Sequence, residues 1–117
     1  MTFSIQSTLS AITAFGKKMA VTANNIANVE SEGFKKSTAK LVEGPVNNVE
    51  VEIEQPDIPG PVVVDGADGQ LTEREMSNVD LAEEIPQTIV AQRGYEANLA
   101  TLRTQDEMLK SIIDIIK

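Results

Sequence analysis

The sequence predicts a mainly α-helical chain whose N- and C-terminal helices pair as a coiled-coil hairpin, with a small β-hairpin or flap formed by the middle segment. Near both ends, apolar residues recur at alternating spacings of three and four positions, which is the pattern of a heptad seam. In residues 49–54, Val or Ile alternates with Glu, which is typical of a half-exposed strand. We therefore expect a helical core made of residues 1–34 and 77–117, and a short extended segment over residues 35–76.

The first helix is expected over about residues 4–27. At 1.5 Å per residue, such a helix is roughly 36 Å long. Gly16 and Ala23 occupy two positions of the seam, where their small size would let a partner helix approach closely. The asparagine-rich run at residues 24–28, followed by Gly33, indicates the end of the helix. The large apolar residues of this seam are Ile5, Leu9, Ile12, Met19 and Ile26.

The second seam begins at Leu81 and continues to the C-terminus. Because proline is tolerated only in the first turn of a helix, we expect the main helix to begin at Pro86, after a short helical turn. Gln92 and Asp106 are polar residues at seam positions, so either they fix the register of the pairing or the helices diverge there. The residues expected to pair with the first helix are Tyr95, Leu99, Leu102, Leu109, Ile113 and Ile116.

Some residues near the C-terminus do not fit a single helical hairpin. The four isoleucines between residues 112 and 116 cover most of the helix circumference, so this end is either buried by further subunits or a frayed terminus. Gly94 lies off the seam in mid-helix, where glycine costs about 1 kcal/mol relative to alanine. We therefore expect contacts between copies of the chain. The residues expected at these contacts are Asn24, Asn25, Asn28, Gly94, Ile112 and Ile115.

The middle segment contains a second extended stretch. Val62–Val64 follows a Pro-Gly-Pro sequence and precedes a turn rich in Asp and Gly, which predicts a short strand. We expect the flap to face outward and to be dispensable for folding of the helices. The acidic turn superficially resembles a calcium loop, but an EF-hand loop starting at Asp65 would need oxygen ligands at positions 67 and 69, where Ala and Gly stand. We therefore expect no metal site.

Composition excludes several classes of function. The net charge is -8, so binding to the phosphates of nucleic acids is disfavoured. The chain has no histidine and no cysteine, one of which the usual nucleophile–base dyads and triads require. No apolar run approaches the ~18 residues of a membrane span, and the N-terminus lacks the basic flank of a Sec signal peptide. We expect no catalytic residue, no cofactor, no nucleic-acid partner and no insertion into a membrane.

Two sets of motifs, one near each end, resemble those of the axial proteins of the bacterial flagellum. The first is Val-Thr-Ala-Asn-Asn-Ile-Ala-Asn-Val at residues 21–29, followed by Gly-Phe-Lys at 33–35. The second is Ser-Asn-Val-Asp-Leu-Ala-Glu-Glu at 77–84, followed by Ala-Gln-Arg-Gly-Tyr-Glu-Ala-Asn at 91–98 and Asp-Glu-Met-Leu at 106–109. The short middle segment makes the chain most similar to the proximal rod proteins of the basal body.

The resemblance implies a structural subunit with no catalytic residues and no cofactor. Its terminal helices would pair into a core domain of the hollow rod, in contact with copies of itself and with other rod subunits. It also implies delivery by the flagellar type III export apparatus, without a cleaved signal peptide, to the rod that spans the periplasm. The residues alone leave a second class open, a cytoplasmic helical adaptor that holds a partner helix and stays inside the cell.

Overall fold

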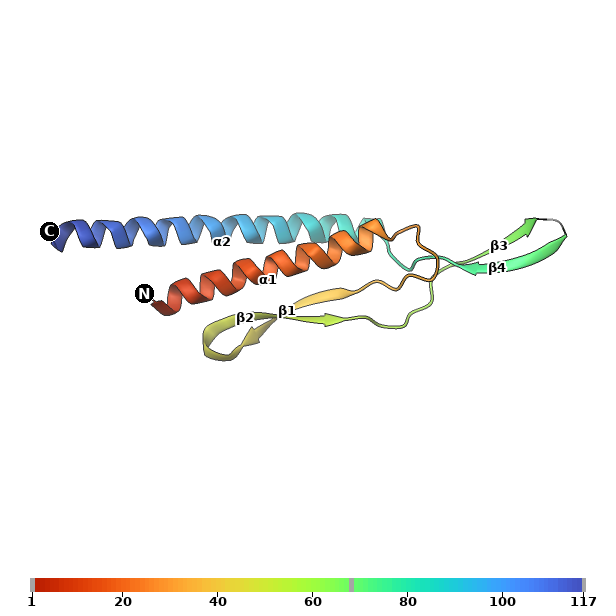
Figure 1. The fold of residues 1–117 in the computed structure, drawn as a ribbon, viewed down its shortest axis with the longest axis horizontal. Coiled ribbons are helices and arrows are strands. Elements are labelled where there is room, and N and C mark those ends of the chain that lie inside the picture. Colours follow the sequence, from red (N-terminus) through yellow and green to blue (C-terminus); the bar gives the residue numbers. More distant parts are fainter. Residues whose placement is uncertain (1, 68, 117) are drawn as a thin grey trace.

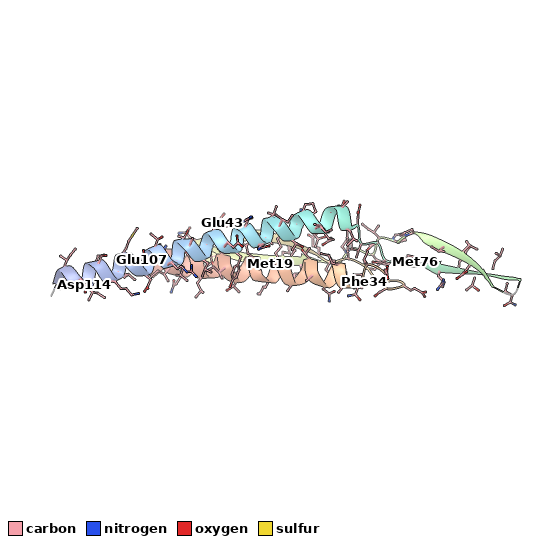
Figure 2. The ribbon with its side chains drawn as sticks, turned by 90° about the horizontal axis from the view of Figure 1, so that it is seen from above. Met19, Phe34, Glu43, Met76, Glu107 and Asp114 are labelled. Atoms are coloured by element: carbon pink, nitrogen blue, oxygen red, sulfur yellow. The ribbon has the colours of Figure 1, made fainter. Side chains whose placement is uncertain are left out.

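Two long helices and two β-hairpins form an elongated molecule of 84 × 23 × 16 Å (Figure 1). The structure is a computed structural model that describes residues 2–67 and 69–116. In chain order, the elements are α1 (Thr2–Ala27), β1 (Thr38–Gly44), the 3-10 turn η1 (Pro45–Asn47), β2 (Asn48–Glu54), β3 (Val62–Ala67), β4 (Gln70–Glu75) and α2 (Leu81–Ile116). The two helices lie side by side in both views (Figures 1 and 2).

Helix α1 ends where the sequence predicts. The backbone N–H and the side-chain amide of Asn28 both donate to the carbonyl of Asn24 (3.2 and 2.9 Å), so Asn28 closes the last turn of the helix. Gly33 has a φ of 65°, a left-handed conformation that glycine adopts without a steric penalty. The chain then reverses direction and enters β1.

Helix α2 begins at Leu81, five residues before the predicted start of the main helix. Asp80 caps it, because its Oδ1 accepts a hydrogen bond from the backbone N–H of Ala82 (2.8 Å). The helix then runs without a break through Pro86. Proline at this position leaves only the carbonyl of Ala82 without its usual helical partner, and Ala82 is exposed to solvent. The prediction that the main helix begins at Pro86 is therefore wrong.

The middle segment forms two antiparallel hairpins, not one. Strands β1 and β2 pair from Thr38 with Glu54 to Gly44 with Asn48, and β3 and β4 form a second two-stranded sheet. The strands predicted at residues 49–54 and 62–64 are confirmed. Strands β1 and β4 were not predicted. Val46, at the tip of the first hairpin, has a φ of 62°, a strained conformation for a β-branched residue.

The two hairpins lie in different surroundings. Hairpin β1–β2 lies along α1, where the backbone N–H of Val49 donates to Ser10 Oγ (3.1 Å) and Ala39 is buried. Hairpin β3–β4 projects from the end of the molecule, beyond the junction marked by Phe34 and Met76 (Figure 2). The expectation of an outward-facing flap is therefore wrong for the first hairpin and describes only the second.

Candidate assembly surfaces

Helices α1 and α2 pack antiparallel, and hydrogen bonds join them near both ends of the interface. At the start of α1, Gln105 Nε2 donates to Ser4 Oγ (2.5 Å). At the end of α1, Asn25 Nδ2 donates to Glu84 Oε2 (3.1 Å). These two contacts fix which residues of the helices face one another.

The most protected positions of the helix pair are small or polar. The buried residues of α1 are Thr8, Ala11, Ala14, Thr22 and Asn25. On α2, a buried or half-buried series recurs at spacings of four and three residues: Glu84, Thr88, Ala91, Tyr95, Asn98, Leu102, Gln105 and Leu109. Small side chains at these positions let the two backbones approach closely. The helices therefore meet over a thin interface with few large apolar side chains.

The predicted seam lies partly beside this interface. On α1, Ile5, Ile12, Met19 and Ile26 are half-buried, whereas Leu9 is 54% exposed. On α2, the predicted seam positions 88, 95, 102 and 109 belong to the protected series. The seam positions between them, 85, 92, 99 and 106, each lie one residue after a member of that series. Gln92 and Asp106 are therefore exposed, and their neighbours Ala91 and Gln105 are protected instead. Of the predicted α2 residues, Tyr95, Leu99, Leu102 and Leu109 are half-buried, and Ile113 and Ile116 are exposed.

Gly94 has a packing role inside the chain. A β-carbon at this position would lie 2.4 Å from Cε1 of the Phe15 ring on α1, closer than side-chain atoms approach one another in folded proteins. Glycine is therefore the residue that admits the aromatic ring to the helix interface. This contact lies within the chain, and a contact of Gly94 with another subunit stays a prediction.

Asn25 lies at the centre of a buried polar cluster that joins three segments. Its side chain is 1% exposed. Its amide nitrogen donates to the Ser37 carbonyl (2.7 Å) as well as to Glu84, and its amide oxygen accepts from the Ser37 N–H (3.0 Å). Asn25 was expected between subunits, but these bonds commit it to its own chain. Asn24 is exposed and Asn28 is half-buried, and both remain predicted contact residues.

Sequence reasoning missed Glu84 as the partner of Asn25. Glu84 is only 7% exposed although it lies in the first turn of α2. A signal was present, because Glu84, Thr88, Ala91 and Tyr95 follow a spacing of four, three and four residues. That series contains little apolar surface, so a search for large hydrophobic residues passes over it.

The C-terminal part of α2 extends beyond the start of α1 (Figure 1). Since Ser4 lies opposite Gln105, the residues after Leu109 have no partner helix within the part of the chain that the structure describes. Ile112 and Ile113 are 41% and 56% exposed, and Ile115 and Ile116 are 83% and 80% exposed. This end of α2 is therefore an aliphatic surface open on all sides.

Charged groups hold the base of hairpin β3–β4. The Lys35 ammonium donates to the Glu75 carboxylate, and the Gly60 N–H donates to the same carboxylate (2.8 Å). These two hydrogen bonds hold the pKa of Glu75 below its ordinary value, with Lys35 as the larger cause. Arg74 also pairs with Glu32 (2.6 Å). The direction in which the hairpin leaves the molecule is thus fixed at its base.

The part of the chain that the structure describes contains no histidine and no cysteine. Within residues 2–67 and 69–116, no cluster of three or more His, Cys, Asp or Glu side chains could hold a metal ion. Neither described helix is long and apolar enough to cross a membrane. Three surfaces are open to partners: the isoleucine-rich end of α2, the projecting hairpin β3–β4, and a groove beside β1 lined by residues that include Lys36–Val42.

Two protein-family models match the chain. The family described as "Flagella basal body rod protein" matches residues 5–35, which contain most of α1 and the turn after it. The family described as "Flagellar basal body rod FlgEFG protein C-terminal" matches residues 71–115, which contain most of β4 and nearly all of α2. The two matches come in the order of the two helices and together span more than half of the chain.

Relatives align with the chain over short segments. Flagellar hook protein FlgE of Escherichia coli (strain K12) is 46% identical over 41 residues, which is 35% of this chain and 10% of the relative. Flagellar basal-body rod protein FlgG of Bacillus subtilis (strain 168) is 43% identical over 53 residues, which is 44% of this chain and 20% of the relative. FlgG of Borreliella burgdorferi is 57% identical over 35 residues, or 30% and 13% of the two chains. This chain thus spans a small fraction of the relatives it matches.

The two family models match most of the helix pair α1–α2, which forms the body of the molecule. The families concerned consist of structural, non-enzymatic components of the flagellum. The chain therefore belongs to the family of flagellar rod and hook axial proteins, and it is a structural protein and not an enzyme.

Proposed function

We propose that the chain is a subunit of the flagellar basal-body rod, which assembles through its terminal helices with copies of itself and with other rod subunits. Of the two axial structures, the rod is favoured because both family models are described as basal-body rod proteins. In this proposal the helix pair, acting as a coiled coil, forms part of the wall of a hollow shaft that transmits torque and conducts exported subunits. The subunit itself reaches the rod through the flagellar type III export apparatus.

The observation that carries the proposal is the exposed isoleucine surface at the end of α2. Burial of one isoleucine side chain contributes about 1.5–3 kcal/mol relative to exposure. Because Ile112 is 41% exposed and Ile115 is 83% exposed, covering what remains open of both would contribute about 2–4 kcal/mol to each contact. An affinity loss of that size is on the order of 10- to 10³-fold per contact. A rod that repeats this contact in every subunit would not form without it.

The corresponding experiment replaces both residues by serine, Ile112→Ser with Ile115→Ser. We expect the monomer to keep its helicity, because α1 does not cover these residues, and we expect rod formation and motility to be lost. The matched control, Ile112→Leu with Ile115→Leu, keeps the aliphatic surface and should remain motile. Leu102→Ser, in the helix interface, should lower both helicity and assembly. Normal motility of the serine variant would show that this end of α2 is only a frayed terminus.

A deletion strain, and cells with and without an intact export apparatus, test the competing proposal of a cytoplasmic adaptor. A rod subunit should leave the cytoplasm only in cells with an intact export apparatus, and its deletion should stop rod completion in purified basal bodies. An adaptor should stay in the cytoplasm, and its deletion should leave the rods complete.

A further inference from the structure

Each two-stranded sheet of this chain has open edges. Among the residues that the structure describes, β1 and β2 pair only with each other, as do β3 and β4. A two-stranded hairpin is marginally stable in water by itself, and three or more strands, or packing against a helix, are needed for independent stability. Hairpin β1–β2 has α1 beside it, whereas β3–β4 makes no comparably extensive contact with another helix or strand. The second hairpin therefore lacks the support that such a structure needs.

The open edge of β3 is suited to strand pairing. Val62, Val63 and Val64 are 57%, 45% and 53% exposed, and all three are β-branched residues that favour strands. Exposed edges are normally protected by charged residues, proline or bulges; the first half of β3, residues 62–64, contains none of these, whereas Pro61 precedes it and Asp65 follows it. Strand β4, in contrast, carries charged side chains at residues 73–75. Of the two edges, β3 is the one prepared for a partner strand.

A groove of about 900 Å³ runs along the open side of β1, between this strand, α1 and the first turns of α2. Seven consecutive residues, Lys36–Val42, line it. Lys36 and Ser37 lie before β1, and their N–H groups donate to Asn78 and Asn25. The other five, Thr38–Val42, are consecutive residues of the strand, whose alternate side chains point to opposite faces, so here the groove follows the edge of β1. Strand β1 has 7 residues and β3 has 6, so their lengths match.

The charges of the two surfaces are complementary. Lys18, Lys36 and Lys40 line the groove together with two glutamates, which leaves the groove basic. Residues 62–75 of the second hairpin carry four acids and one arginine; of the acids, Glu75 pairs with Lys35 and Asp65 pairs with Arg74. Lys36 and Lys40 already pair with Glu83 and Glu54, but Lys18 has no carboxylate within 4.0 Å among the residues that the structure describes. Lys18 is the cation in the groove that is available to an acidic partner.

We propose that hairpin β3–β4 of one copy adds its β3 edge to the open edge of β1 in a second copy, so that two two-stranded sheets become one four-stranded sheet. The hairpin cannot reach the groove of its own chain in the observed conformation, because it leaves the molecule in the opposite direction to β1 (Figure 1). The contacts of Lys35 and Arg74 at its base hold that direction.

Donor and acceptor surfaces of this contact differ, so in a pair of copies the donor keeps a free groove and the acceptor keeps a free hairpin for further copies. Head-to-tail contacts of this kind build open helical filaments when the rotation between copies does not close a ring. The inference rests on the proposed assembly function and adds a contact that does not involve the end of α2.

The test uses the purified full chain in sedimentation velocity at concentrations up to the millimolar range. Val64→Lys places a charge on the β3 edge, and Lys18→Glu places an acid in the groove. The matched controls are Ile58→Lys, an exposed position outside the hairpin, and Lys17→Glu, the neighbouring lysine that does not line this groove. We expect the wild type and both controls to form oligomers that grow with concentration. Each test variant should associate more weakly, on the order of tenfold or more.

Mixing the two test variants gives the decisive result. The Lys18→Glu copy keeps a functional hairpin and the Val64→Lys copy keeps a functional groove, so an equimolar mixture should form dimers that grow no further. A wild type that stays monomeric, a mixture without dimers, or test variants that behave like their controls would overturn the inference. A motile Val64→Lys strain beside a non-motile Ile112/Ile115 serine strain would reject this contact alone, whereas motility of both would reject the proposed function as well.

Discussion

The contact between Gly94 and Phe15 yields a sharp prediction about the helix interface. The substitution Gly94→Ala adds one methyl group at a point 2.4 Å from the Phe15 ring, so the ring or the helix must move. Such overpacking costs about 1–3 kcal/mol. Alanine is also a better helix former than glycine by about 1 kcal/mol, which offsets part of this cost. We therefore expect a net destabilisation of roughly 0–2 kcal/mol.

Gly16 supplies the control, because a β-carbon there would meet nothing within 4 Å. Gly16→Ala should keep the full gain in helix propensity of about 1 kcal/mol. The difference between the two variants removes the propensity contribution and leaves the cost of overpacking, about 1–3 kcal/mol. In urea unfolding followed by circular dichroism, with a slope of about 2 kcal/mol per molar, the midpoints should differ by roughly 1 M.

A double-mutant cycle assigns the cost to the aromatic ring. Phe15→Ala removes the ring, so Gly94→Ala made in that background should no longer be destabilising and should resemble Gly16→Ala. If Gly94→Ala and Gly16→Ala stabilise the wild-type protein equally, the ring is free to move away and the proposed role of Gly94 is refuted.

Three further predictions concern other parts of the chain. Asn25→Ala leaves buried polar partners unsatisfied and should lower the free energy of unfolding by about 1–3 kcal/mol, whereas the more exposed Asn28→Ala should cost about 0.5 kcal/mol or less. An NMR titration should find the pKa of Glu75 below its ordinary value, and in Lys35→Ala this pKa should move back towards normal. The stabilisation that Glu75 gives to the base of the hairpin is therefore complete above the ordinary glutamate pKa. It is lost as the pH falls through the lowered pKa. Val46→Gly should relieve left-handed backbone strain of about 1–2 kcal/mol in η1. The greater backbone freedom of glycine in the unfolded chain offsets part of this gain. A urea midpoint below that of the wild type would contradict the predicted stabilisation.

The sequence predicted secondary structure correctly where one hydrophobic periodicity extends over the whole element. The alternation of Val or Ile with Glu predicted β2, and the 3–4 periodicity predicted both long helices. Strand β1 escaped prediction because residues 38–44 have no clean alternation of apolar and polar side chains. Pro86 misled the prediction of the start of α2, because the cap at Asp80 lies far enough upstream for the proline to fall in the second turn.

The phase of the helix interface was the hardest feature to predict. Large aliphatic residues defined the predicted seam, but the protected positions hold Ala91, Gly94 and Asn25, whose burial depends on how closely the two backbones approach. Hydrophobicity alone cannot report such closeness. The exposed isoleucines at the end of α2 were recognised from sequence as surplus to a single hairpin, whereas the groove beside β1 depends on a strand that the sequence did not indicate.

The hydrogen bonds at the two ends of the helix pair fix how α1 and α2 are aligned along their length. Between Asn25 with Glu84 at one end and Gln105 with Ser4 at the other, the Phe15 ring packed against Gly94 is a third contact that fits in one alignment. A slip of one heptad would move the helices about 10 Å past each other and break both sets of bonds together. A subunit pulled along its length should therefore hold its register under rising load and then yield in a single step, without creeping gradually.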